Sequence, residues 1–162
     1  MRSTGARIKL IPDGDVSAVI ATSFENSGVD IYMGTGGSPE GVLAAAALRC
    51  IGGKMYGKLI FNNQEEKDRA KSMGINDLNK IYTTSELASG DVMFSATGVT
   101  DGTLLKGVLV KDDIATTQSV VMRSKSKTLR YVDAIHNIKV KNIITWKGVP
   151  LRLLVFDLLF NL

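Results

Sequence analysis

Short apolar segments alternate with amphipathic segments over the first ninety residues of the chain. The apolar segments at 6–11, 28–34 and 54–60 have the length and composition of strands, and the second is apolar enough for a buried central position. Helical spacing of apolar residues, or a run of good helix formers, follows each strand. These patterns predict helices at 15–24, 38–51 and 63–74, and a short helix at 85–89. The first part of the chain therefore has the order βαβαβα.

The pattern changes after residue 90, where strands follow one another without helices between them. Four segments rich in β-branched residues, at 91–98, 104–110, 116–124 and 128–136, are separated by polar turns. This order is typical of a β-meander. Together the two parts predict the α/β class, as a layered sandwich around a mixed sheet. Residues 1–138 form one lobe in this prediction, and residues 139–162 are a divergent tail of different character.

Composition limits the classes of function. The chain has 162 residues and a formal net charge of +4. That excess suits an anionic partner, but it is too small and too scattered to indicate nucleic acid, so a solvated basic surface is the simpler interpretation. One cysteine allows no intramolecular disulfide and favours a reducing compartment, and no signal peptide is visible, so we expect a cytoplasmic protein. Arg152 and Asp157 interrupt the apolar tail, so no membrane span is expected.

The most distinctive stretch is the glycine loop "GTGGSPEG", which lies between a predicted strand and a predicted helix. Ser38 can cap that helix, and Pro39 suits its first position. A Rossmann fingerprint would need glycine where Pro39 stands, and the Gly-Lys-Ser/Thr of a P-loop is absent. Two interpretations remain. The loop is a tight turn in which Glu40 complements the helix dipole, or Glu40 faces a crevice and attracts a hard cation such as Mg²⁺ or Mn²⁺.

A second strand-to-helix turn carries Asp13, Gly14 and Asp15. An EF-hand would need glycine and glutamate where Ala18 and Phe24 stand, so that interpretation fails. The turn is then an Asx-turn with Asp15 as helix cap, or a pair of carboxylates that binds a polyol or a metal. If the two preceding strands are parallel neighbours, both turns open on one edge of the sheet, and Asp13, Asp15 and Glu40 surround one crevice.

Other reactive residues favour structural roles. Cys50 ends an apolar helix and is expected to pack as a small hydrophobic residue. His136 is the only histidine and lies at the end of the last predicted strand without a partner for nucleophilic catalysis. The segments 96–102 and 123–130 are expected to be ordinary hairpin turns, with phosphate or anion contacts as the alternatives.

Four segments taken together resemble a known family: "DGDV", "GTGGSPEGVLAAAALRCIGGKMYGKL", "FSATGVTDGTLLKGV" and "TTQSVVMRSKSKTLRYVDAIH". In this order they are similar to the C-terminal half of class II fructose-1,6-bisphosphatases of the GlpX type, some of which also accept sedoheptulose 1,7-bisphosphate. The resemblance implies the layered α/β fold of metal-dependent sugar and inositol phosphatases. It also implies hydrolysis of the 1-phosphate of fructose 1,6-bisphosphate, in gluconeogenesis or Calvin-type carbon metabolism.

The resemblance assigns roles to individual positions. Asp13, Gly14 and Asp15 match a segment that binds the sugar phosphate, Gly37 matches a substrate-contacting glycine, and Glu40 matches a ligand of a divalent metal, Mn²⁺ or Mg²⁺. The family's remaining metal ligands belong to an N-terminal half that this sequence does not contain.

One glutamate cannot hold a metal cluster, so we expect little activity from this chain alone. A missing N-terminal half or a second copy of the chain is the expected partner. A non-catalytic module that binds sugar phosphate or a partner is the alternative, and a truncated gene product without function is a third possibility.

Overall fold

The computed structural model describes residues 2–140. Its helices are α1 (Asp15–Ala21), α2 (Ser38–Ile51), α3 (Gln64–Ser72) and α4 (Thr84–Leu87), with short 3₁₀ turns at Arg2–Thr4 and Glu25–Ser27. The strands are β1 (Tyr56–Lys58), β2 (Ile81–Thr83), β3 (Met93–Thr97), β4 (Leu109–Lys111), β5 (Ile114–Arg123) and β6 (Thr128–Asn137). The α/β class and all four helices are confirmed, most of them within a few residues of the predicted ends.

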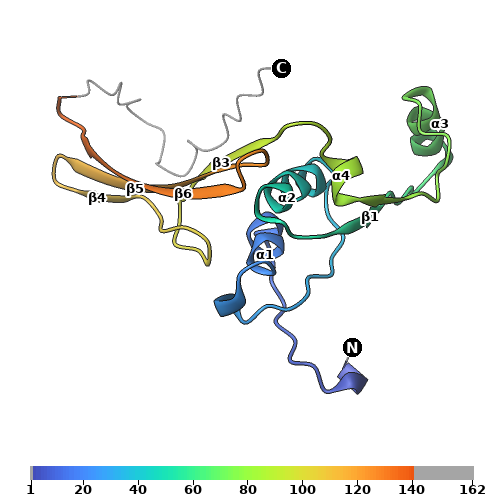
Figure 1. Cartoon of the computed structure of the whole chain (residues 1–162), viewed down its shortest axis with the longest axis horizontal. Helices are drawn as coiled ribbons and strands as arrows, with labels where there is room; N and C mark the ends of the chain where they lie inside the picture. The colour runs from blue at the N-terminus through green and yellow to red at the C-terminus, as the bar shows by residue number, and fades with distance from the viewer. Residues whose placement is uncertain (1, 141–162) are drawn as a thin grey trace.

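The larger sheet is built around β5. The whole length of β6 pairs with one edge of β5 in antiparallel register, with Val120 opposite Tyr131. The other edge of β5 is shared: β3 pairs with 119–123, and β4 pairs with 114–116. The loop between β3 and β4 is therefore not the hairpin predicted for 96–102, whereas the predicted turn between β5 and β6 is confirmed. Figure 1 shows the resulting curved ribbon of strands.

Helix α2 packs between the larger sheet and α1 (Figure 1). Its Ala-rich sequence suits this position, because alanine is a strong helix former and its small side chain lets neighbouring layers approach. The helix ends at Gly52, whose φ of 90° is a left-handed conformation that glycine adopts without strain. The core between α1, α2 and the sheet consists of Ile20, Ala47, Cys50, Phe94, Leu105, Val120 and Met122.

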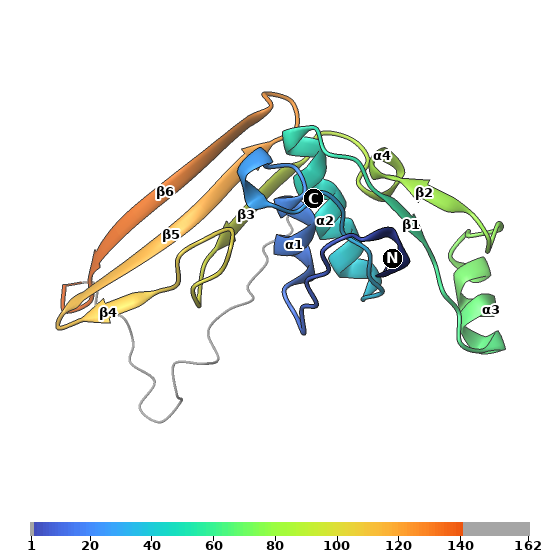
Figure 2. The ribbon, with the colours of Figure 1, turned by 90° about the horizontal axis from the view of Figure 1, so that it is seen from below.

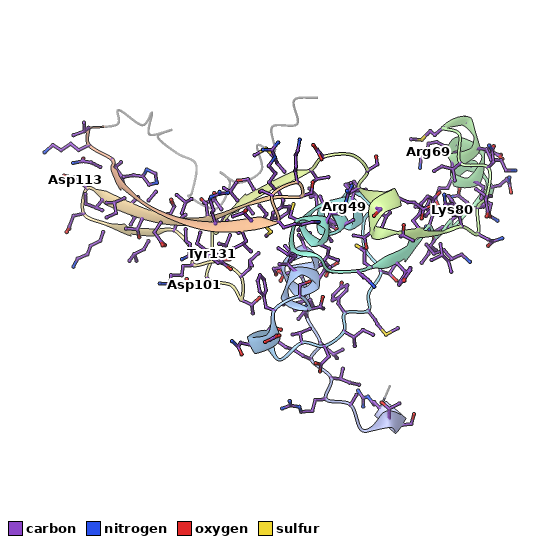
Figure 3. The ribbon with its side chains drawn as sticks, viewed as in Figure 1. Arg49, Arg69, Lys80, Asp101, Asp113 and Tyr131 are labelled. Carbon is purple, nitrogen blue, oxygen red and sulfur yellow. The ribbon has the colours of Figure 1, made fainter. Side chains whose placement is uncertain are left out.

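Arg49 fastens the end of α2 to the segment that follows α4. Its guanidinium donates hydrogen bonds of 2.6 Å to the Ala88 carbonyl and 2.8 Å to the Gly90 carbonyl. In Figure 3, Arg49 lies between the two helices. Lys127, in the β5–β6 turn, donates a 2.7 Å hydrogen bond to the Arg49 carbonyl, so a cation also complements the C-terminal end of the helix dipole.

The smaller sheet pairs β1 and β2 in antiparallel register. Strand β2 was not predicted, because its three residues lie between two loops and are too few to show a pattern. In Figure 1 this sheet leads away from α2 to α3. The N-terminus of α3 is capped by Asn63, whose side chain accepts a 2.8 Å hydrogen bond from the Glu66 backbone N–H.

Two predicted strands are wrong. Segments 6–11 and 28–34 form no strand, and the described strands pair only antiparallel, so they do not make the predicted mixed sheet. The physical reason is that an apolar segment becomes a strand only beside a partner strand, and residues 2–140 place none next to either segment. The predicted tail at 139–162 lies outside the described residues from 141 onward. Within 2–140, no helix has the length and apolarity needed to cross a membrane.

Candidate functional site

The backbone conformation of Gly14 shapes the turn at Asp13–Asp15. Gly14 has φ 78°, in the left-handed region, and its carbonyl accepts a 2.8 Å hydrogen bond from the Ser17 hydroxyl. Helix α1 begins at Asp15, with Gly14 in the capping position, so the prediction of Asp15 as the cap is wrong by one residue. As a first-turn residue, Asp15 still places its carboxylate at the positive end of the helix dipole.

The glycine loop leads into α2 in an equivalent way. Gly37 takes the capping position with an extended backbone, and Ser38 and Pro39 lie in the first turn, one position later than predicted. The Gly37 N–H donates a 3.0 Å hydrogen bond to Oε2 of Glu40. Because glycine has no side chain, this is one half of a capping box, and Glu40 alone closes it. The structural interpretation of Glu40 therefore accounts for one of its two carboxylate oxygens.

Two other glutamates at the third position of a helix also accept a backbone N–H from a residue that precedes the helix. Glu86 Oε2 accepts a 2.9 Å hydrogen bond from the N–H of the capping residue Thr83 at α4, and Glu66 Oε2 accepts one of 2.7 Å from the Asn62 N–H, one residue before the cap Asn63 of α3. Helix capping by a glutamate is thus a repeated device in this chain, and it does not by itself identify a functional site. What separates Glu40 from the other two glutamates is its surroundings.

Gly36 lies between two carboxylates. A methyl group placed on its Cα would stand 3.0 Å from Asp15 Oδ2 and 3.3 Å from Glu40 Oε2. The predicted convergence of Asp15 and Glu40 thus occurs at Gly36, although it arises between two loops and not at the edge of a parallel sheet. The Glu40 oxygen at this position is Oε2, which also accepts the Gly37 N–H, and a side chain here would crowd both carboxylates, so glycine keeps that space open.

Tyr32 adds a third group that sequence reasoning missed. Partial burial, the hydrogen bond to the Asp15 carboxylate, and the negative charges of Asp15 and Glu40 together raise the pKa of the Tyr32 hydroxyl. The hydroxyl therefore stays protonated and donates to Asp15. The Tyr32 hydroxyl also occupies the space beside Gly34 where a Cβ would stand. The one available signal was a tyrosine two residues before the glycine loop.

The remaining candidate residues lie apart from this cluster or are structural. Asp13 is exposed and has no hydrogen bond or ion pair within 2–140. Burial raises the pKa of the Cys50 thiol, and Cys50 is fully buried in the core, so it does not supply a nucleophile. His136 faces Thr117 across β5 and β6, with 3.0 Å between its Nε2 and the Thr117 hydroxyl oxygen.

The site offers oxygen ligands of the type that hard cations prefer, but it offers few of them. Carboxylate oxygens are the ligands that Mg²⁺ and Mn²⁺ prefer, and Glu40 has one oxygen that does not cap the helix. In the part of the chain that the structure describes, however, no group of three or more acidic, histidine or cysteine side chains could hold a metal. The geometry thus brings two carboxylates together beside Gly36, without the further ligands that a cation needs.

Comparison with known families gives the same family that the four sequence segments indicate. A family model described as "Bacterial fructose-1,6-bisphosphatase, glpX-encoded" matches residues 1–136. The match covers well over half of the chain, and it includes the glycine loop and the Asp13–Asp15 turn. The chain belongs to the glpX-encoded bacterial fructose-1,6-bisphosphatase family.

Curated relatives carry the name "D-fructose 1,6-bisphosphatase class 2/sedoheptulose 1,7-bisphosphatase". The protein from Crocosphaera subtropica is 47% identical over 149 residues, and that from Trichodesmium erythraeum is 44% identical over 149 residues. Each match covers 84% of this chain and 43% of the relative. The chain therefore spans less than half the length of the relatives that it matches.

Proposed function

We propose that this chain is the C-terminal lobe of a divalent-metal-dependent bisphosphatase that acts in the cytoplasm. The reaction is hydrolysis of the 1-phosphate of fructose 1,6-bisphosphate to fructose 6-phosphate and phosphate. The observation that carries this proposal is the convergence of Asp15 and Glu40 on Gly36, in a chain of the bisphosphatase family. A tight turn needs neither the second carboxylate nor the open space between them.

Each residue has a role that follows from its chemistry. Glu40 keeps one oxygen on the Gly37 N–H and offers the other to Mn²⁺ or Mg²⁺, so the helix cap fixes the direction of the ligand. Asp13 and Asp15 repel a phosphate directly, so they accept hydrogen bonds from sugar hydroxyls. The backbones of Gly14 and Gly37 let the substrate approach closely. When bound, the divalent cation supplies Lewis-acid polarisation of the phosphoryl group.

The shortage of ligands determines the expected behaviour of the purified chain. A cation of this class takes about six oxygen ligands, and some of these are waters. One glutamate, even with Asp15 beside it, leaves the site incomplete. We therefore propose that the remaining ligands come from the part of the enzyme that this chain does not span.

The test is reconstitution of activity. Phosphate release from fructose 1,6-bisphosphate with Mn²⁺ would be measured for three samples. These are the 162-residue chain, the part of the Crocosphaera subtropica enzyme outside the match, and their mixture. Activity is expected in the mixture only. Robust hydrolysis by the chain alone would contradict the incomplete site, and a stable but inactive mixture would contradict the enzymatic function.

A binding module without catalysis is the second candidate, favoured by the loop geometry without a three-carboxylate group. Calorimetry of the chain with fructose 6-phosphate separates the two. Binding by the chain alone, with no activity in the mixture, would favour the module. A second copy of the chain as partner would appear as a dimer in sedimentation.

A further inference from the structure

Two extended segments of the chain expose apolar side chains at alternating positions. In segment 6–11, Ile8 is 45% exposed and Leu10 is 82% exposed, and in segment 28–34, Ile31 is 66% and Met33 is 69% exposed. Alternation with a period of two is the pattern of a strand that buries one face. Both segments have this pattern, yet these four apolar side chains face solvent.

The backbone of these segments also lacks backbone partners. Within residues 2–140, neither segment belongs to a strand pair, and no backbone-to-backbone hydrogen bond involves residues 6–11 or 28–34, although the Val29 N–H donates to the Ser27 hydroxyl oxygen. Extended backbone with open N–H and C=O groups is a template on which another strand can pair. Figure 1 shows the N-terminal segment running away from α1 and from both sheets, and in Figure 2, seen from below, it lies in front of α1 and α2.

Both segments lead directly into the candidate site. Segment 6–11 ends just before the Asp13–Asp15 turn, and segment 28–34 runs into the loop of Gly36 and Glu40. The turns that follow the two segments approach each other, because Asp15 Oδ2 would stand 3.0 Å from a methyl group on Gly36. Whatever pairs with these segments therefore also fixes the spacing of the two carboxylates.

We propose that segments 6–11 and 28–34 are two strands of an incomplete sheet, and that the occupant is a β-strand from the part of the enzyme that corresponds to the unmatched region of the curated relatives. This inference rests on the function proposed above, and it specifies where the two parts of the enzyme join. More than half of each relative lies outside the match, which is ample length for such a strand.

The charges on segment 6–11 argue against a second copy of the chain in this place. Arg7 and Lys9 alternate with Ile8 and Leu10, so they lie on the opposite face of the extended backbone. An antiparallel pairing of two copies would bring these cations near one another, and like charges in facing positions destabilise a strand pair. The geometry instead fits a strand with apolar residues on one face and acidic residues on the other.

Hydrogen exchange measured by mass spectrometry tests the contact without any reference to activity. The full chain would be exchanged alone and in the presence of the part of the Crocosphaera subtropica enzyme outside the match. Amides of 6–11 and 28–34 are expected to exchange freely in the chain alone. In the mixture they should exchange at least tenfold more slowly. Amides of α3, which is remote from both segments, should not change.

Three matched variants test the side chains. Leu10→Asp and Ile31→Asp place a charge on the proposed contact, and Met73→Asp places one on a side chain that is 75% exposed at the end of α3. None of the three is buried, so thermal unfolding of the isolated chain should hardly change. We expect at least tenfold weaker binding of the other polypeptide for the first two variants, and unchanged binding for Met73→Asp.

The outcomes separate this inference from the proposed function. Protection of both segments in an inactive mixture would support the proposed strand pairing and contradict the proposed bisphosphatase function. Activity in a mixture that leaves both segments unprotected would support the enzyme and overturn the contact. Absence of binding, normal binding by Leu10→Asp and Ile31→Asp, or protection that arises from dimers of the chain alone would each overturn the contact.

Discussion

Replacement of Glu40 separates helix capping from metal binding, because the two roles use different properties of the side chain. The cap needs an oxygen that accepts the Gly37 N–H at 3.0 Å, and glutamine provides one. A metal ligand needs a charged carboxylate. Glu40→Gln should therefore keep most of the cap and lose most of the ligand, whereas Glu40→Ala should lose both.

The magnitudes follow from these contacts. Glu40→Ala removes a hydrogen bond with a net value of about 1 kcal/mol and a charge–dipole interaction of about 0.3–1 kcal/mol, so the free energy of unfolding should fall by about 1–2 kcal/mol. Glu40→Gln removes only the charge–dipole interaction. With a melting shift of roughly 3–4 °C per kcal/mol for a chain of this size, Glu40→Gln should lower Tm by about 1–4 °C.

Glu66 is the control, since it holds the same third position in α3, accepts a backbone N–H from Asn62 just before the cap, and has no proposed ligand role. Glu66→Gln should lower Tm about as much as Glu40→Gln does. Mn²⁺ affinity of the reconstituted mixture would be measured by the electron paramagnetic resonance signal of free Mn²⁺. Loss of ligand-supporting groups weakens metal binding by about 10–100-fold, and we expect at least that loss for Glu40→Gln. Equal Mn²⁺ affinity in the Glu40→Gln and Glu66→Gln mixtures would refute the ligand role.

Two further predictions concern stability and pH. Met122→Ala should lower the free energy of unfolding by about 2–5 kcal/mol in urea titrations, because Met122 is fully buried, whereas exposed Met73→Ala should change it by less than about 0.5 kcal/mol. An equal effect of the two substitutions would contradict the placement of Met122 in the core. The Thr83 backbone N–H and then Lys80 lower the pKa of Glu86 from 4.5 to about 2. Its contribution to stability is therefore complete above about pH 4.5 and is lost as pH falls through about 2. In an NMR titration, Lys80→Met should raise the Glu86 midpoint, and an unchanged midpoint would contradict the ion pair.

The sequence correctly predicted the elements whose apolar residues pack against other described residues. It was wrong for the two predicted strands that have no neighbouring strand within residues 2–140. The helix at 38–51 and the hairpin of β5 and β6 were predictable, because their apolar positions find partners within residues 2–140. Segments 6–11 and 28–34 show equally good strand patterns, but Leu10 and Ile31 remain exposed. A hydrophobic pattern reports that a face can be buried, and it does not say which polypeptide buries it.

For the candidate site, the sequence indicated which residues could meet but gave the wrong geometry for their meeting. Asp15 and Glu40 were expected on one edge of a parallel sheet, and they meet at Gly36 between two loops. Tyr32 was not foreseen, because a hydrogen bond from a tyrosine to a carboxylate seventeen residues earlier has no periodic signature. The roles of Asp13, Gly14 and Gly37 toward a substrate stay predictions until the binding measurements are made.

The arrangement around β5 has a consequence for how the larger sheet comes apart. Within the described residues, β3, β4 and β6 each pair with β5 and with no other strand. Ser119 lies opposite Thr97 on one side and Val132 on the other, so a kink at this residue would disturb two ladders together. Each outer strand can therefore detach without breaking another ladder, whereas loss of β5 removes all three ladders at once.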